Sequence, residues 1–298
     1  MPIPVILDTD IGTDIDDTWA LAMLIRSPEL DLKLALTGTA DTAYRARIAA
    51  KLLQIADRPD VPVGIGLRFD PGGEFQAAWL GDYRLESYPG TVHEDGVAAL
   101  IETVRASADP VTIIAIGPLP NLRRALELAP DIAGRCRLVG MHGSLDRGYG
   151  PGSAPVAEAN VRNDVEAART VFAAPWRDIL LTPLDTCDDA ILHGDRYRRV
   201  LGSSDPLVRA VVENYRVWQE HVPWNHGGRF EDRSSTLFDT VAVYLAYCEE
   251  HLAIEEIKVR VTDDGYTVRD DSGSHVRAAV RWTDLEAYLD HLTTRMSE

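Results

Sequence analysis

Apolar and polar positions in the first two thirds of the chain alternate in the manner of an α/β protein. Apolar runs of strand length are separated by segments in which apolar residues recur at helical spacing. The runs predict strands at 5–8, 32–36, 61–65, 111–116, 137–141 and 179–181. The intervening segments predict helices at 17–28, 42–56, 93–107, 122–128 and 164–172. This alternation is typical of an open, mostly parallel, Rossmann-like sheet flanked by helices.

Irregular segments interrupt this alternation. Residues 67–92 are rich in Gly, Pro and aromatic side chains and show no clear period, so we interpret them as a long loop over the functional site. Residues 142–157 form a second irregular loop. From about 186 to 250 the pattern is mainly helical, with a break at 222–235.

The C-terminal segment predicts a hairpin. Two strands, 257–261 and 266–269, flank the turn signal Asp263-Asp264-Gly265. A further strand at 276–281 and a helix from Thr283 complete the chain. Because no repeat, low-complexity tract or linker divides the sequence, we expect a single domain over residues 1–298.

Composition narrows the class of partner. The 298 residues, 45% of them hydrophobic, suffice for one large α/β domain or two small ones. A net charge of −17, from 47 acidic and 30 basic residues, argues against a nucleic acid or an anionic membrane as partner. We expect no secretory signal, because a strand begins almost at once, and no membrane span. Three widely spaced cysteines without a C-x-x-C pair indicate reduced thiols and a cytoplasmic location.

The first predicted strand leads into five carboxylates within ten residues, Asp8, Asp10, Asp14, Asp16 and Asp17. Two carboxylates about 5 Å apart repel by roughly 3 kcal/mol at an effective dielectric constant of about 20. A bound cation offsets that cost, and ligands that are all oxygen atoms favour Ca²⁺ or Mg²⁺ over zinc. Acids also suit a helix N-terminus, but this alternative does not explain Asp8 and Asp10 at the end of a buried strand, where open α/β sheets bind ligands.

Five short motifs follow one another along the chain: Asp8-Thr9-Asp10, Asp16-Asp17, Gly117-Pro118-Leu119-Pro120-Asn121, Ala157-Glu158-Ala159-Asn160 and Phe238-Asp239. In this order and spacing the chain resembles the inosine-uridine preferring nucleoside hydrolases over nearly its whole length. The resemblance implies an N-glycosyl hydrolase that converts ribonucleosides to free base and ribose. It also implies Ca²⁺ as cofactor and a homodimer or homotetramer.

The resemblance further assigns roles to matching positions. It implies that Ca²⁺ is bound by Asp10, Asp17, Asp239 and the backbone carbonyl of Ile116. Contacts to the ribose hydroxyls are implied for Asp16, Asp41, Glu158 and Asn160. As a mechanism we expect a metal-bound water to be the nucleophile, with Asp10 taking its proton and an oxocarbenium-like transition state.

Departures from the family pattern concern the leaving base. The acidic motif is two residues longer than usual, which leaves the role of Asp14 open, and Gly152 replaces an expected Asn. Phe238 stands where the family carries a histidine credited with protonating the base, a function that typically contributes about 10² to 10⁴ in rate. Candidate replacements are His93, which has the best support, His142 and His226, with Trp79, Trp224 or Phe238 as stacking walls. Base specificity stays open.

Two other functions fit parts of the sequence. A ribonucleoside-binding protein that kept the metal and lost turnover is compatible with Phe238 and Gly152. A haloacid-dehalogenase-like phosphatase also begins with Asp8-x-Asp10. That class usually has Thr or Val at the position of Gly12 and a basic residue at a later strand end, whereas the chain has only three lysines, Lys33, Lys51 and Lys258.

Overall fold

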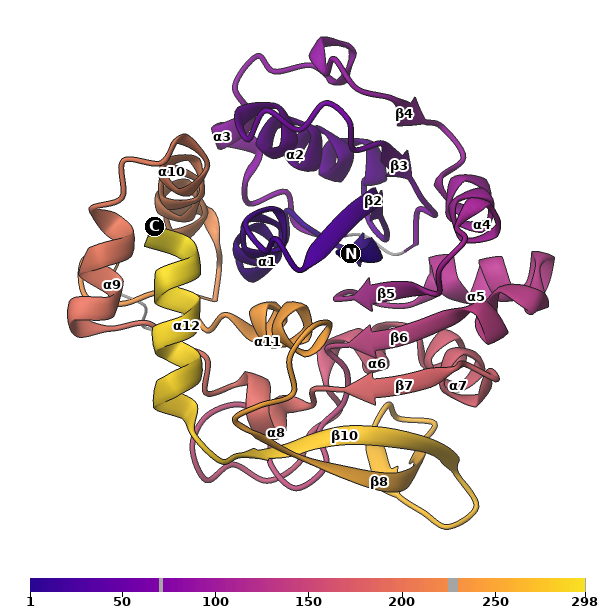
Figure 1. Ribbon diagram of the computed structural model, residues 1–298. Helices are drawn as coiled ribbons and strands as arrows, with labels where there is room; N and C mark the ends of the chain where they lie inside the picture. The colour runs from indigo at the N-terminus through magenta and orange to yellow at the C-terminus, as the bar shows by residue number, and fades with distance from the viewer. Residues whose placement is uncertain (70–71, 225–229, 298) are drawn as a thin grey trace.

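The computed structural model describes residues 1–69, 72–224 and 230–297. Within them, one ten-stranded sheet has the order β4-β3-β2-β1-β5-β6-β7-β10-β8-β9 (Figure 1). The strands are β1 (Ile3–Thr9), β2 (Leu30–Thr37), β3 (Val63–Ile65), β4 (Val92–His93), β5 (Val111–Ala115), β6 (Cys136–Gly140), β7 (Asp178–Leu181), β8 (Leu252–Val261), β9 (Thr267–Arg269) and β10 (Ser274–Trp282). All pairings from β4 through to β10 are parallel. The predicted open, mostly parallel sheet is confirmed.

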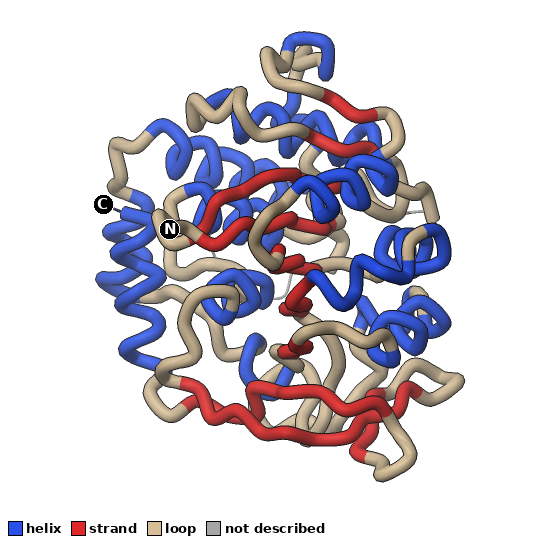
Figure 2. The backbone as a smooth tube through the Cα atoms, turned by 45° about the vertical axis from the view of Figure 1, so that its right-hand side comes forward, coloured by secondary structure: helices blue, strands red, loops and turns tan. Residues whose placement is uncertain are grey.

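Helices cover both faces of the sheet (Figures 1 and 2). One face carries α1 (Asp16–Ile25), α2 (Thr42–Ile55), α3 (Ala77–Leu80), α8 (Leu184–Cys187), α9 (Gly194–Leu201), α10 (Pro206–His221), α11 (Phe238–Leu245) and α12 (Leu285–Ser297). The other carries α4 (Gly96–Ala106), α5 (Pro120–Leu128), α6 (Ala159–Asn163) and α7 (Val165–Ala173). No helix in the described ranges has the length and apolar character that crossing a membrane requires.

Two hydrophobic cores lie on opposite faces of the sheet because successive side chains of a strand alternate in direction. In β1, Val5 and Leu7 pack into the core with α1 and α11, whereas Ile6 packs into the core with α4 and α5. Both sides of β1 are buried, which explains why its sequence reads as a continuous apolar run rather than an alternating one.

The direction in which the sheet grows reverses beside β1. From β1 the chain adds β2, β3 and β4 on one side, and then returns to place β5, β6 and β7 on the other. β1 therefore pairs with both β2 and β5. Such a switch point leaves a crevice outside the carboxyl ends of the two central strands, where open α/β sheets bind ligands.

The C-terminal strands close the sheet with an antiparallel ribbon. β8 and β9 pair antiparallel, with Val261 opposite Thr267, so the predicted hairpin is present. β10 lies between β7 and β8, parallel to the first and antiparallel to the second. β8 is longer than expected because it pairs with β10 back to Leu252.

Several sequence-based boundaries were wrong, among them those around residue 93. The helix expected from residue 93 begins at Gly96, because His93 belongs to β4 and pairs with Gly64, and Asp95 accepts the backbone N–H of Ala98 as the N-cap. The segment 67–92 is not wholly irregular, since it contains α3 and the start of β4. The break expected at 222–235 lies partly outside the described residues.

Candidate active site

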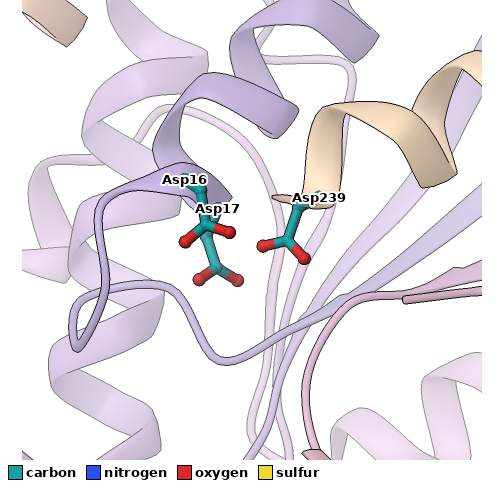
Figure 3. Close-up of side chains that lie close together, drawn as sticks. All are labelled: Asp16, Asp17 and Asp239. Carbon is teal, nitrogen blue, oxygen red and sulfur yellow. The ribbon is translucent and has the colours of Figure 1, made fainter. Parts of the chain in front are cut away.

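Three carboxylates from two helix starts converge beyond the switch point. Asp16 and Asp17 lie in the first turn of α1, and Asp239 lies in the first turn of α11. Each contributes a carboxylate oxygen, and these oxygens lie within 4.8 Å of one another. Figure 3 shows the three side chains pointing toward the same space between the helices. A set of oxygen ligands of this kind suits a hard divalent cation.

Burial makes this cluster electrostatically unfavourable on its own. Asp16, Asp17 and Asp239 are at most 4% exposed. Burial, followed by repulsion from neighbouring carboxylates, raises the pKa of all three well above the ordinary value. Buried carboxylates at this spacing need protons or a cation, and the residues present therefore fit a divalent ion.

Asp10 lies at the same edge, against the end of β5. The backbone N–H of Ile116 donates to the carbonyl oxygen of Asp8 at 2.9 Å, which fixes the end of β5 beside the end of β1. A Cβ atom added to Gly117 would lie 2.8 Å from Oδ1 of Asp10, so the Asp10 carboxylate packs on this backbone. Burial raises the pKa of Asp10, and Arg45 opposes that rise. Asp10 also repels Asp17 and Asp239 electrostatically.

Asp8 and Thr9 hold the acidic loop between β1 and α1 in place and do not add ligands to the carboxylate cluster. The Thr9 hydroxyl donates to the Asp17 carboxylate and accepts the N–H of Ile11 at 3.1 Å. Asp8 accepts a hydrogen bond from Nδ2 of Asn121 at 2.8 Å, while its Oδ2 has no partner among the described residues. Burial raises the pKa of Asp8 to about 7. Asn121 also accepts the N–H of Leu67 at 2.8 Å, so this pair connects β1 to the loop after β3.

The longer acidic loop is held by polar side chains that the sequence did not reveal. Arg45 is 2% exposed and donates to the carbonyl oxygens of Ile11 at 2.8 Å and Thr39 at 3.0 Å. Its guanidinium also lies 3.9 Å from the Asp10 carboxylate. In the sequence, the one indication of this role is that Arg45 falls on the apolar side of the predicted helix 42–56.

Gln76 and Trp218 complete this support. They donate to the carbonyl oxygens of Asp14 and Thr13, at 2.6 Å and 2.9 Å respectively. Burial, opposed by the Ile15 N–H and reinforced by the charge of Asp10, raises the pKa of Asp14 to about 6. Asp14 therefore belongs to the acidic cluster electrostatically, although its own carboxylate accepts the adjacent N–H of Ile15 at 2.7 Å.

Glu158 and Asn160 lie at the start of α6, beside the ends of β5 and β6. Glu158 caps the helix and accepts the backbone N–H groups of Gly143, Asn160 and Val161 at 3.0, 2.6 and 3.2 Å. Burial raises its pKa to about 7 despite these bonds. Nδ2 of Asn160 donates to the carbonyl of Met141 at 3.0 Å and lies 3.4 Å from the Ile116 carbonyl oxygen. The structure thus brings the motifs around residues 10, 17, 116, 160 and 239 to one end of the sheet.

Comparison with known proteins assigns the fold and site to a family. The sequence model described as inosine-uridine preferring nucleoside hydrolase matches residues 5–290. The chain belongs to this family. It is accordingly an N-glycosyl hydrolase, and the resemblance drawn from the five motifs is confirmed.

Curated relatives carry related names. The chain is 32% identical over 229 residues to the non-specific ribonucleoside hydrolase RihC of Klebsiella pneumoniae, covering 72% of this chain and 73% of that protein. It is 27% identical over 279 residues to the probable uridine nucleosidase 2 of Arabidopsis thaliana, covering 88% and 83% of the two chains.

Solved structures share the fold. A plant nucleoside hydrolase, the PpNRh1 enzyme, superimposes with a TM-score of 0.85 at 24% identity, covering 100% of this chain and 99% of that one. A purine-preferring ribonucleoside hydrolase from Gardnerella vaginalis gives a TM-score of 0.78 at 24% identity, covering 99% and 98%. At 24% identity, the structural similarity supports a shared fold and no more.

His142, predicted near the substrate, is buried in the structure, and its role at the site stays a prediction. Its ring is 1% exposed, and Nε2 lies 3.0 Å from the carbonyl oxygen of Gly117. The ring packs edge to face on Phe172 of α7. Burial lowers the pKa of His142 to about 4, although the bond to Gly117 opposes that shift. His142 therefore packs against the turn after β5 through its contact with Gly117.

Three other predicted site residues make no hydrogen bond to the acidic cluster within the described part of the chain. Trp79 is 7% exposed, with Nζ of Lys51 at 4.0 Å from its ring centroid, and its role as a stacking wall stays a prediction. Asp41 caps α2 by accepting the N–H of Tyr44 at 2.9 Å. His93 lies in β4, three strands away from β1. The roles predicted for Asp41 and His93 stay predictions, and His226 lies outside the described residues.

Phe238 remains beside the cluster because it directly precedes Asp239 at the start of α11. Its ring is half-buried and meets the ring of Tyr149 edge to face, with centroids 6.0 Å apart. The aromatic pair is thus a neighbour of both the acidic cluster and the loop before α6.

Proposed function

We propose that this enzyme hydrolyses the N-glycosidic bond of ribonucleosides, releasing free base and ribose, with Ca²⁺ as its cofactor. The observation that carries the proposal is the convergence of Asp16, Asp17 and Asp239 at the switch point of the sheet. The names of the curated relatives, a ribonucleoside hydrolase and a uridine nucleosidase, support the substrate class.

The cation would be held by the carboxylates of Asp10, Asp17 and Asp239 and by the carbonyl of Ile116. Buried oxygen donors and the raised pKa values of Asp17 and Asp239 support this assignment. When bound, such an ion supplies positive charge that polarises water and ribose hydroxyls. The ion also offsets the repulsion within the cluster.

The chain's own carboxylates carry the remaining steps. Asp10 takes a proton from the water that attacks C1′, since its side chain is partly exposed whereas those of Asp17 and Asp239 are buried. Asp16, Glu158 and Asn160 hold the ribose hydroxyls. As the bond to the base breaks, positive charge develops on the sugar ring. Surrounding carboxylates stabilise that charge more than they stabilise the neutral substrate.

A panel of purine and pyrimidine ribonucleosides tests this function, with free ribose as the readout. We expect release of ribose from at least one member, and a loss of several orders of magnitude in kcat for Asp10→Asn with folding retained. Asp82→Asn, at an exposed position, is the matched control and should keep full activity. Tight binding with no ribose released over hours would instead identify a ribonucleoside-binding protein, and phosphate release from a phosphomonoester would identify a phosphatase.

Assembly and location follow the same proposal. We propose a homodimer or homotetramer, which sedimentation equilibrium would test and a monomeric mass would contradict.

A cytoplasmic location is supported by the three free cysteines Cys136, Cys187 and Cys248. Localisation of the tagged protein outside the cytoplasm would contradict it.

A further inference from the structure

Tyr149 connects the two helix starts that border the acidic cluster. It lies in the loop between β6 and α6, and its hydroxyl accepts the backbone N–H of Ala159 at 3.3 Å. Its ring stands perpendicular to that of Phe238, with an interplanar angle of 89°. Ala159 lies between Glu158 and Asn160, and Phe238 precedes Asp239. The side chain therefore borders both the proposed ribose contacts and the proposed metal ligands.

The Tyr149 side chain is accessible to solvent, and its hydroxyl hydrogen is available for a hydrogen bond to a ligand. The residue is 45% exposed. Its oxygen accepts the N–H of Ala159, but its O–H has no acceptor among the described residues. A tyrosine hydroxyl has an ordinary pKa of about 10. The group thus stays protonated at neutral pH and acts as a hydrogen-bond donor.

The chemistry of the leaving group requires such a donor. A purine or pyrimidine departs poorly as an anion, and a positioned hydrogen-bond donor that stabilises the developing negative charge typically contributes about 10² to 10³ in rate. Phe238 has no polar hydrogen, His142 is buried and bonded to Gly117, and His93 lies three strands from β1. Among these residues Tyr149 alone combines exposure, a free O–H and proximity to the cluster.

We propose that Tyr149 contacts the leaving base and donates its hydroxyl hydrogen to a ring nitrogen or exocyclic oxygen of that base, with Phe238 as the adjoining apolar wall. The inference rests on the proposed function. As water oxygen bonds to C1′, the electron pair of the breaking C1′–N bond passes to the base. The proton from water passes to Asp10, Tyr149 keeps its own proton throughout, and the released base is protonated from solvent.

The test compares two leaving groups in Tyr149→Phe, which keeps the ring and removes the hydroxyl. We expect kcat/KM for a ribonucleoside to fall about 10²-fold, the loss typical of removing one hydrogen-bond donor to a developing negative charge. For 4-nitrophenyl β-D-ribofuranoside we expect a change below about threefold, because nitrophenolate leaves without help. Tyr266→Phe, an exposed tyrosine in the C-terminal hairpin, is the matched control and should leave both rates unchanged.

Each other outcome overturns the inference in a recognisable way. Unchanged nucleoside turnover in Tyr149→Phe removes the hydroxyl from the reaction, while the proposed function stands. Equal losses on both substrates show that Tyr149 only maintains the local structure. A wild-type enzyme that releases ribose from neither substrate refutes the proposed function itself, and the role of Tyr149 falls with it.

Discussion

Gly117 illustrates how a single backbone position sets the geometry of the site. Its Cα packs so closely on Asp10 that a methyl group would meet Oδ1 at 2.8 Å. In Gly117→Ala the Asp10 carboxylate must move, and a displacement of about 1 Å at a catalytic group costs on the order of 10² in rate. We expect this loss in kcat with little change in thermal stability. Gly134→Ala, where no atom lies within 4 Å of the added methyl, should keep full activity, and equal effects of the two substitutions would contradict this role.

His142 should couple folding stability to pH. Burial lowers its pKa from 6.5 to about 4, so the unfolded chain binds a proton near pH 6.5 whereas the folded protein does so only near pH 4. Stability is therefore lost as the pH falls through this window. At pH 5 the cost is about 2 kcal/mol. In His142→Gln the free energy of unfolding, measured by urea titration, should fall less between pH 7 and pH 5 than in the wild type. Parallel curves would show that His142 does not titrate in this way.

The local sequence revealed some of these residues and not others. The five carboxylates between Asp8 and Asp17 are adjacent in sequence, so their crowding was visible directly. Asp239 was found only through the resemblance, because a lone acid near a helix start is otherwise ordinary. Tyr149 and Arg45 act through contacts with residues far away in the chain, and such contacts leave no local pattern.

Helix α2 stabilises the acidic loop through Arg45. This buried guanidinium donates to the carbonyl oxygens of Ile11 and Thr39, and its removal leaves both without this donor. We expect Arg45→Met to lower the free energy of unfolding by roughly 3 kcal/mol. Within the described residues, Arg47 on the same helix donates to the carbonyl of Tyr83 alone, so Arg47→Met should cost roughly 1 kcal/mol. Equal losses in chemical denaturation would argue against a special role for Arg45.

Strands were easier to predict than the short elements between them. β1 and β5 are buried on both faces over most of their length, and this produces long apolar runs that stand out in the sequence. β4 has only two residues and α3 only four, too few to show a period. Their structure depends on pairing with β3 and packing on α2 and α10, which the sequence alone does not specify.

The sheet unites both ends of the chain, which supports our proposal that residues 1–298 form a single domain. Its strands extend from Ile3 in β1 to Trp282 in β10, and α12 packs on both α9 and α1. Scanning calorimetry of the metal-loaded enzyme should therefore show one unfolding transition. Two separate transitions, or a fragment that folds alone, would contradict the proposal.

The protein as a whole is strongly acidic, with a net charge of −17, and its densest buried charge lies at the switch point of the sheet. We attribute this concentration of carboxylates to a divalent cation on which turnover depends. If these acids only began helices and bound no ligand, nothing would offset the cost of burying their negative charges together. The raised pKa values of Asp16, Asp17 and Asp239 reflect that cost.

The most direct measurement follows ribose release from a ribonucleoside as Ca²⁺ is returned to enzyme freed of divalent cations by a chelator. We expect turnover to fall by at least about 10³-fold after chelation, since the ion supplies several kcal/mol of stabilisation. Activity should return as Ca²⁺ is added and saturate at one ion per chain. Undiminished turnover in the metal-free enzyme would contradict the central claim.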